Sequence, residues 1–284
     1  MAGRFRLGVM ELLEGVAGRC LVMGVLNVTP DSFSDGGDYL DPDDAIAHGL
    51  TLAAQGADIV DVGGESTRPG AARVDVEEEI RRVRPVIVGL VGEGVAVSID
   101  TTRAAVAEAA LSAGASMVND VSWGSADPTL VKVVAEAAVP YVVMHSRGDS
   151  ATMQQQAVYA DVVGEVVAEL RQRVDEVVAA GVAPELVVVD PGLGFAKNAE
   201  HNLELLADLA AVLLLGSPVL VGASRKSFLG AVLGGRDVRD RDDATQAVTT
   251  LAAWQGAWGV RVHDVRPAAD AVRVVAAIQR AAGS

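Results

Sequence analysis

Short apolar runs alternate with helical patterns along the whole chain, and this alternation limits the folds that the chain can adopt. The apolar runs lie at residues 21–26, 58–62, 95–99, 116–118, 139–144, 186–189, 218–222 and 259–263. Strands joined by helical crossovers are parallel, and parallel sheets are covered by helices. Both an open doubly wound sheet and a closed barrel satisfy this rule, but eight units in 284 residues favour the barrel. We therefore predict an α/β fold, a single (β/α)8 TIM barrel over residues 1–284 with residues 1–19 as an N-terminal extension packed on it.

Several segments between the apolar runs carry helix start and stop signals. Asp41 is a candidate N-cap before a first-turn proline, and Gly56 is a candidate stop for the same helix. Asp75 with Glu78 predicts a capping box at the start of the next helix. Valines and leucines at helical spacing predict one long helix over residues 158–177.

Charge and cysteine usage limit the partners and the compartment of the protein. The formal net charge of −15 argues against general affinity for nucleic acid or for an anionic membrane. Cys20 is the only cysteine, so no internal disulfide can form and a reducing compartment is expected. No export signal or membrane span is recognised, and we predict a cytoplasmic protein with small-molecule substrates.

Carboxylate and amide side chains follow three of the predicted strands. Asp100, Asn119 and Asp190 each stand where an apolar run ends. Barrel active sites form at the C-terminal ends of the strands, so these groups are expected to converge at one mouth. A flat ring with adjacent N–H donors, such as a 2-amino-4-oxo pteridine, would satisfy them. The alternative is that the three residues are helix N-caps.

A second group of strand-end residues is cationic. Its members are Arg68, Arg225, Lys226, Arg261 and His263. Arg261 and His263 are two residues apart on a strand and are expected to share a face, an arrangement that suits phosphate oxygens. The alternative is a surface arginine beside a hydrogen-bonded histidine. By contrast, the alternating charges of residues 236–243 predict a solvated loop.

Three other kinds of site are not supported by the spacing of the motifs. Residues 63–70 lack the Gly-x-x-x-x-Gly-Lys-[Ser/Thr] pattern of a nucleotide cradle. The chain has no His-Glu-x-x-His sequence and no cysteine cluster for zinc. His145 and Ser146 have no partners at the spacing that would mark a hydrolase triad.

Residues 24–37 and 56–70 resemble the two signature segments of the dihydropteroate synthases. Five shorter motifs resemble the remaining sites of that family in the same order, at residues 97–101, 119–120, 190–192, 224–226 and 261–263. The resemblance covers roughly residues 20–280. It implies condensation of 6-hydroxymethyl-7,8-dihydropterin diphosphate with 4-aminobenzoate, which releases diphosphate and gives 7,8-dihydropteroate for folate synthesis. It also suggests a homodimer.

The resemblance further implies a role for each matched residue. The residues implied to bind the pterin are Asp100, Asn119, Met144, Asp190, Gly222 and Lys226. The residues implied to bind the diphosphate are Asn27, Thr67, Arg68, Arg261 and His263. The residues implied to bind the aminobenzoate are Phe33, Thr67, Pro69, Phe195, Ser224 and Arg225. Asn27 would help to hold Mg²⁺, the implied cofactor, and the implied catalytic residues are Asn27, Arg68, Asp100 and Lys226.

Two other functions compete with this interpretation. A pterin barrel of the methyltetrahydrofolate:corrinoid methyltransferase type would keep the acidic rim but would not need residues 224–226 or the Arg261 and His263 pair. A non-catalytic pterin-binding paralogue would be expected to have lost Asn27, Thr67 or Arg68, and all three are present.

Overall fold

The computed structural model of the protein describes residues 11, 13, 18–29, 41–65, 74–148 and 152–283. Its centre is a parallel eight-stranded sheet in the order β6-β5-β4-β3-β2-β1-β8-β7, and a bridge between Val189 and Val219 joins the two edges. The strands are β1 (Leu21–Asn27), β2 (Ile59–Gly63), β3 (Val97–Asp100), β4 (Met117–Asp120), β5 (Tyr141–Met144), β6 (Val187–Asp190), β7 (Leu220–Val221) and β8 (Gly259–Val262). The predicted (β/α)8 barrel is confirmed.

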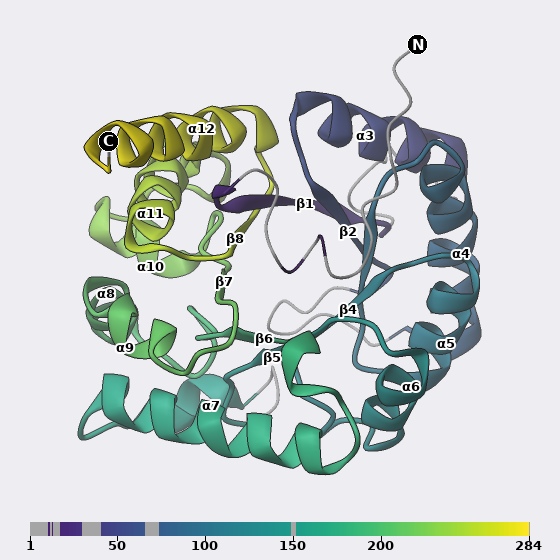
Figure 1. Ribbon diagram of the computed structural model, residues 1–284, viewed down its shortest axis with the longest axis horizontal. Coiled ribbons are helices and arrows are strands. Elements are labelled where there is room, and N and C mark those ends of the chain that lie inside the picture. Colours follow the sequence, from purple (N-terminus) through teal and green to yellow (C-terminus); the bar gives the residue numbers. More distant parts are fainter. Residues whose placement is uncertain are drawn as a thin grey trace.

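Helices surround the strands on the outside of the barrel (Figure 1). The α-helices are α3 (Pro42–Gln55), α4 (Val76–Gly92), α5 (Ala104–Ser112), α6 (Thr129–Ala137), α7 (Val162–Ala179), α8 (Ala199–Ala207), α9 (Leu209–Leu213), α10 (Ser227–Val232), α11 (Asp242–Gln255) and α12 (Val265–Ala282). Short 3-10 turns are η2 (Met153–Gln156), η3 (Pro184–Leu186) and η4 (Val238–Asp240). None of the helices within the described ranges is long and apolar enough to cross a membrane.

The register of the sheet places the polar strand ends in one row. Asn27 pairs with Gly63, Gly63 with Asp100, and Asp100 with Asn119. Most strands therefore end later than their apolar runs, because the backbones of these polar residues still pair in the ladder. The row brings Asn27, Asp100 and Asn119 to the same height at the barrel mouth.

The inside of the barrel changes from apolar to charged along its axis. A buried cluster made only of strand residues contains Leu21, Met23, Ile59, Met117, Val142, Val188 and Leu220. Side chains alternate between the two faces of a strand, so the next inward residue after Ile59 is Asp61, which is completely buried. The much larger second cluster joins the outer faces of the strands to the helices.

The helix ends agree with most of the predicted signals. The Asp41 side chain accepts a hydrogen bond from the Asp43 amide, and Gly56 ends α3 with a φ of 112°. The predicted capping box forms only in part, because the Asp75 side chain caps α4 while the Glu78 carboxylate accepts from Arg81 and Arg82. The long helix predicted over residues 158–177 begins only at Val162. The predicted N-terminal extension lies almost entirely outside the described residues.

Gly56 offers a test of how the first helix is terminated. An L-residue at this φ is strained, and its Cβ would lie 2.9 Å from the Cβ of Ala269. We expect Gly56→Ala to lower the free energy of unfolding by about 1–2 kcal/mol in a denaturant titration. Gly92→Ala is the matched control, because Gly92 ends α4 with nothing within 4 Å of the new Cβ. Equal stability of the two variants would contradict the assignment.

Candidate active site

One arginine joins two carboxylates from different strands inside the barrel mouth. The Arg261 Nε atom donates to Asp61 Oδ2 at 2.6 Å, and its Nη2 atom donates to Asp100 Oδ2 at 2.7 Å. Asn119 Nδ2 donates to the same Asp61 oxygen at 2.9 Å. Asp61 and Asp100 are almost fully buried, and charges in such a place require partners. The arrangement explains how the barrel tolerates an acidic interior.

The second oxygen of each carboxylate remains available. Asp61 Oδ1 and Asp100 Oδ1 are buried and have no hydrogen-bond partner among the described residues. Burial raises the pKa of Asp100 to about 7; Arg261 opposes this shift, whereas the neighbouring Asp61 carboxylate reinforces it. Asp100 therefore offers an acceptor for a ligand N–H group at the mouth, and its charge depends on pH near neutrality.

The opposite side of the mouth pairs another buried carboxylate with a lysine. A Cβ on Gly222 would lie 3.6 Å from Asp190 Oδ2 and 3.8 Å from Lys226 Nζ, so glycine keeps the space between them open. Burial raises the pKa of Asp190, and it lowers the pKa of Lys226 to about 8 against the attraction of Asp190. The Asp190 Oδ1 atom accepts from the Gly192 amide at 2.7 Å, which leaves Oδ2 toward this space.

The loop after β6 completes this side. Lys226 Nζ donates to the Leu193 carbonyl and lies 4.8 Å from the centre of the Phe195 ring. Met144 ends β5 directly beside Asp190 in the ladder and is buried. The structure therefore brings together Asp190, Gly222, Lys226, Met144 and Phe195, as the resemblance implies.

The two predicted phosphate-binding residues, Arg261 in β8 and His263 directly after it, contact different partners. Arg261 is held by the two carboxylates, whereas His263 Nδ1 lies 2.9 Å from Ser224 Oγ. The Ser224 hydroxyl also accepts from the His263 amide at 3.1 Å. Arg225 forms two hydrogen bonds with Asp242, at 2.7 and 2.8 Å. Diphosphate binding by Arg261 and His263, and aminobenzoate binding by Ser224 and Arg225, stay predictions.

Phe33, Thr67, Arg68 and Pro69 lie outside the described residues, so their predicted roles stay predictions. Asn27 is half-buried at the end of β1, close to the acidic side of the mouth. A Cβ on Gly63 would lie 3.8 Å from Asn27 Oδ1 and 3.7 Å from Asp100 Oδ2.

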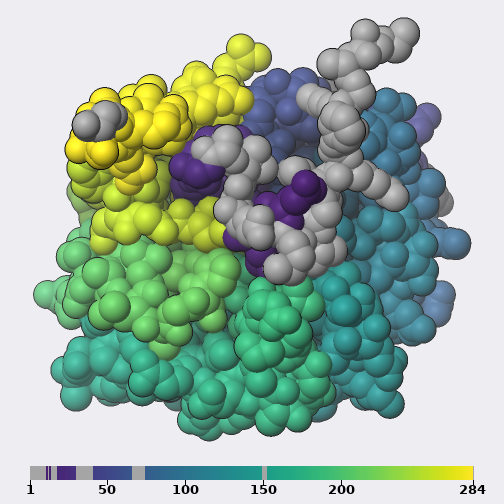
Figure 2. Space-filling model, viewed as in Figure 1, coloured from purple at the N-terminus to yellow at the C-terminus, as the bar shows by residue number. Residues whose placement is uncertain are grey.

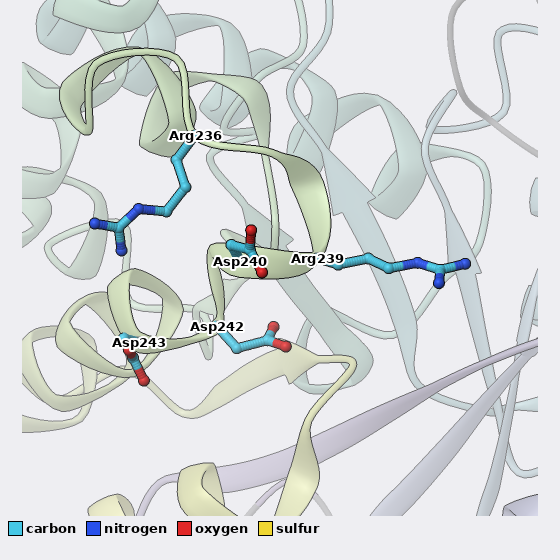
Figure 3. A pocket seen from close by; sticks show the side chains of 5 residues that line it. All are labelled: Arg236, Arg239, Asp240, Asp242 and Asp243. Atoms are coloured by element: carbon cyan, nitrogen blue, oxygen red, sulfur yellow. The ribbon is translucent and has the colours of Figure 1, made fainter.

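Residues 236–240 of this charged run are exposed and precede α11, as predicted, whereas Asp242 and Asp243 begin α11 and Asp242 is paired with Arg225. Figure 3 shows Arg236 and Arg239 pointing away from each other around a surface hollow that Asp240, Asp242 and Asp243 also line. Arg241 differs from the prediction, because its guanidinium donates to the backbone carbonyls of Arg236 and Arg225. It supports the segment that follows β7.

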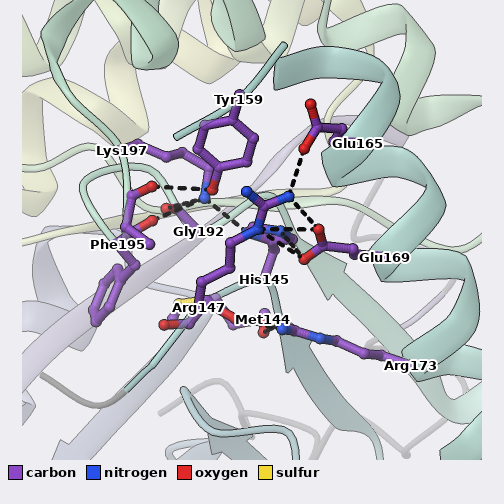
Figure 4. Close-up of polar contacts among 12 residues, drawn as sticks. Met144, His145, Arg147, Tyr159, Glu165, Glu169, Arg173, Gly192, Phe195 and Lys197 are labelled. Carbon is purple, nitrogen blue, oxygen red and sulfur yellow. Dashed lines mark hydrogen bonds and ion pairs between the residues drawn. The ribbon is translucent and has the colours of Figure 1, made fainter. Parts of the chain in front are cut away.

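Sequence reasoning missed two features of the site. Asp61 is one of the two partners of Arg261, and the signal was a charged residue between Val60 and Val62 in an apolar run. Lys197, in the loop after β6, is buried beside His145, and both belong to the polar network of Figure 4. His145 stands directly after a strand, but no spacing in the sequence connects it with Lys197.

The fold and the acceptor-lined mouth define a barrel of the pterin-binding class. The family model described as pterin binding enzyme matches residues 23–263, and the chain belongs to this family. Within it the chain groups with the dihydropteroate synthases: it is 58% identical over 262 residues to the dihydropteroate synthase of Mycobacterium leprae (strain TN), over 90% of this chain and 92% of that one. The predicted family is confirmed.

Two solved structures agree with this placement. Dihydropteroate synthase of Xanthomonas albilineans with 4-aminobenzoic acid has a TM-score of 0.86 and 45% identity, over 92% of this chain and 93% of that one. The same enzyme in complex with 7,8-dihydropteroate has a TM-score of 0.83 and 43% identity, over 92% of this chain and 94% of that one.

The unusual pKa of Asp100 gives a pH prediction. Its folded value of about 7 lies above the ordinary 3.8, so folding favours the protonated form. The resulting stabilisation is fully present below about pH 4 and is lost as the pH rises through about 7. The carboxyl ¹³C signal of Asp100 should titrate near pH 7, and Asp61→Asn should lower that midpoint because it removes the like charge. A midpoint near 4 in the unaltered protein would refute the prediction.

Proposed function

We propose that this mouth condenses 6-hydroxymethyl-7,8-dihydropterin diphosphate with 4-aminobenzoate to form 7,8-dihydropteroate and diphosphate. The observation that carries the proposal is a pair of buried carboxylates at one mouth: Asp100, whose Oδ1 has no hydrogen-bond partner among the described residues, and Asp190, whose Oδ2 faces the space beside Gly222. The relatives named dihydropteroate synthase support it, as does the solved neighbour with 7,8-dihydropteroate. The methyltransferase alternative has no comparable support.

In this proposal the pterin enters the slot edge-on. Its ring N–H and amino groups donate to the free oxygens of Asp100 and Asp190, whose burial makes such hydrogen bonds strong. Asn119 adds an amide edge next to Asp61, and Lys226 faces the oxygen side of the ring. Gly222 leaves room for the ring because a side chain there would meet both Asp190 and Lys226.

The chemical step exchanges one bond for another at the pterin methylene. The carbon–oxygen bond to diphosphate breaks, the aminobenzoate nitrogen forms the new bond to carbon, and the nitrogen loses a proton. We propose that the first bond breaks largely before the second forms, because an aryl amine is a weak nucleophile. Asp100 is placed to stabilise the developing pterin cation, and such fixed charges contribute about 3–4 kcal/mol each.

The leaving group requires positive charge. We propose that Arg68, Arg261 and His263 supply it together with Mg²⁺, which would neutralise diphosphate charge when bound. The described residues contain no group of three His, Cys, Asp or Glu that could hold a metal. This fits Mg²⁺, which keeps several waters and substrate phosphates and needs only one or two protein oxygens. The Asn27 amide oxygen, close to Asp100, is the protein ligand that we propose.

An exposed apolar surface on α11 and α12 supports a homodimer. Leu251 and Trp254 on α11 and Val274 and Ile278 on α12 are each about half exposed. The two helices pack together, and Gln279 donates to the Trp254 carbonyl. We propose that this surface contacts a second copy of the chain and that the dimer resides in the cytoplasm. Light scattering of the purified protein gives its mass directly.

Product formation tests the proposed reaction. Diphosphate release from the pterin diphosphate should require 4-aminobenzoate and should fall when Mg²⁺ is chelated. Mass spectrometry should identify 7,8-dihydropteroate. Release that ignores the amine would overturn the synthase function. Binding of the pterin without turnover would overturn it too and would favour the non-catalytic paralogue.

Asp190→Asn should weaken pterin binding more than it weakens the fold. The new side chain can keep its oxygen on the Gly192 amide, which places the NH₂ group where Oδ2 faced the slot. Two donors would then face each other, and binding of a pterin analogue should lose about 2–4 kcal/mol. Calorimetry measures the loss, and a thermal melt serves as the control. Unchanged affinity with a large drop in Tm would mean that Asp190 is only structural.

A further inference from the structure

Lys197 belongs to the loop that follows β6, and its Nζ atom contacts backbone carbonyls of the same loop (Figure 4). Its side chain is almost fully buried, and its Nζ atom has three acceptors within hydrogen-bond distance. These are the Gly192 carbonyl at 3.1 Å, the Phe195 carbonyl at 2.9 Å and His145 Nδ1 at 2.8 Å. Burial lowers the pKa of Lys197, and the nearby Asp190 carboxylate opposes this shift. The ammonium form has three N–H groups, which matches the three acceptors around Nζ.

His145 and Glu169 continue a chain of hydrogen bonds that begins at Lys197. His145 Nε2 lies 3.0 Å from Glu169 Oε2, and Arg147 holds the same carboxylate. Burial lowers the pKa of His145 to about 4, so the imidazole is neutral at physiological pH. A proton on Nε2 then faces Glu169, and the Nδ1 lone pair faces Lys197. The Asp190 carboxylate, and to a smaller extent the Glu169 carboxylate, favour the charged form of the buried lysine.

The loop itself has an unusual backbone that needs such support. Gly192, Gly194 and Ala196 all have positive φ, at 65°, 82° and 49°. Gly192 approaches His145 so closely that a Cβ would lie 1.8 Å from the His145 carbonyl oxygen. Ala196 is buried in a conformation that L-residues rarely adopt. The two carbonyls that Lys197 binds belong to residues at the start and near the end of this turn.

The same loop forms one wall of the proposed site. The Leu193 carbonyl accepts from Lys226, and the Phe195 ring lies beside the Lys226 ammonium. Asp190 and Lys226 are attached elsewhere, because Asp190 belongs to the β6 ladder and Lys226 precedes α10. Phe195 is different, since it lies in the loop itself. On either side of it, the Gly194 amide donates to Asn202 Oδ1 at 2.7 Å and the Ala196 carbonyl accepts from the Tyr159 hydroxyl at 3.0 Å.

We propose that Lys197, oriented by His145 and Glu169, is a positioning residue for the aminobenzoate side of the site. It draws the Gly192 and Phe195 carbonyls together and so fixes the Phe195 ring against Lys226. This inference rests on the proposed synthase function. Without the lysine, the loop is held less firmly and the amine substrate loses its contact with Phe195. The pterin keeps its hydrogen bonds to Asp100 and Asp190.

Steady-state kinetics of Lys197→Met test the proposal, because methionine keeps most of the length of the side chain and removes the donors. We expect the KM for 4-aminobenzoate to rise at least tenfold and the KM for the pterin diphosphate to change less than threefold. A merely structural role would lower the active fraction and kcat without separating the substrates. Lys132→Met, on the exposed face of α6, is the matched control and should match the unaltered protein. Equal changes in both KM values, or none, would overturn the proposal.

Two further measurements keep the inference testable if Lys197→Met does not fold. Glu169→Gln keeps a hydrogen-bond acceptor for His145 but removes the counter-charge, and it should raise the KM for 4-aminobenzoate in the same direction by a smaller factor. ¹⁵N NMR of the unaltered protein at pH 7 should show His145 with a proton on Nε2 and none on Nδ1. A proton on Nδ1 would exclude donation from Lys197. The NMR result does not depend on turnover, so a protein without synthase activity would refute the proposed function separately.

Discussion

The guanidinium of Arg261 allows two carboxylates to be buried inside the barrel near its mouth. It enters a space that already contains Asp61 and Asp100, two carboxylates that would repel each other in a poorly solvated interior. Removing charges from water is costly unless each charge is paired and hydrogen-bonded. One guanidinium between two carboxylates neutralises only part of their negative charge, and this affects the ligand site. One oxygen of each carboxylate stays without a partner among the described residues, and burial, reinforced by the Asp61 charge, raises the pKa of Asp100 at the point where a ligand rich in N–H groups is proposed to bind.

The residues at the barrel mouth come from two sets of elements, the strand ladder and the segments after β6 and β7. The strand ladder sets the acidic side with little freedom, because the register places Asn27, Asp100 and Asn119 in one row. The other side combines a strand residue, Asp190, with groups from the segments after β6 and β7. These segments are not held by strand pairing, so buried side chains such as Lys197 fix the position of their backbone. In the proposed reaction the pterin contacts both sides, through Asp100 and Asp190, whereas Phe195 in the loop after β6 contacts the amine.

The sequence predicts what depends on local patterns and misses what depends on distant contacts. Apolar runs located all eight strands, and polar residues after them located Asp100, Asn119 and Asp190, because strand ends of a parallel barrel meet at one mouth. Asp61 was hidden by its apolar neighbours, and its role appears only once Arg261 approaches from 200 residues away. The start of α7 was misplaced because Val158 continues the apolar spacing but is exposed before the helix begins.

The position of Arg261 in the chain also has a consequence for how the protein is made. Both of its carboxylate partners lie in the first three strands, whereas the arginine lies in the last strand, which pairs with β1. A growing chain on the ribosome thus carries two inward-facing acids for most of its synthesis with no cation to neutralise them. Those acids favour water over burial, so the early strands are discouraged from closing into a tight incorrect core. Docking of the final strand both closes the ring and neutralises its interior, which makes completion of the fold and completion of the binding site a single event.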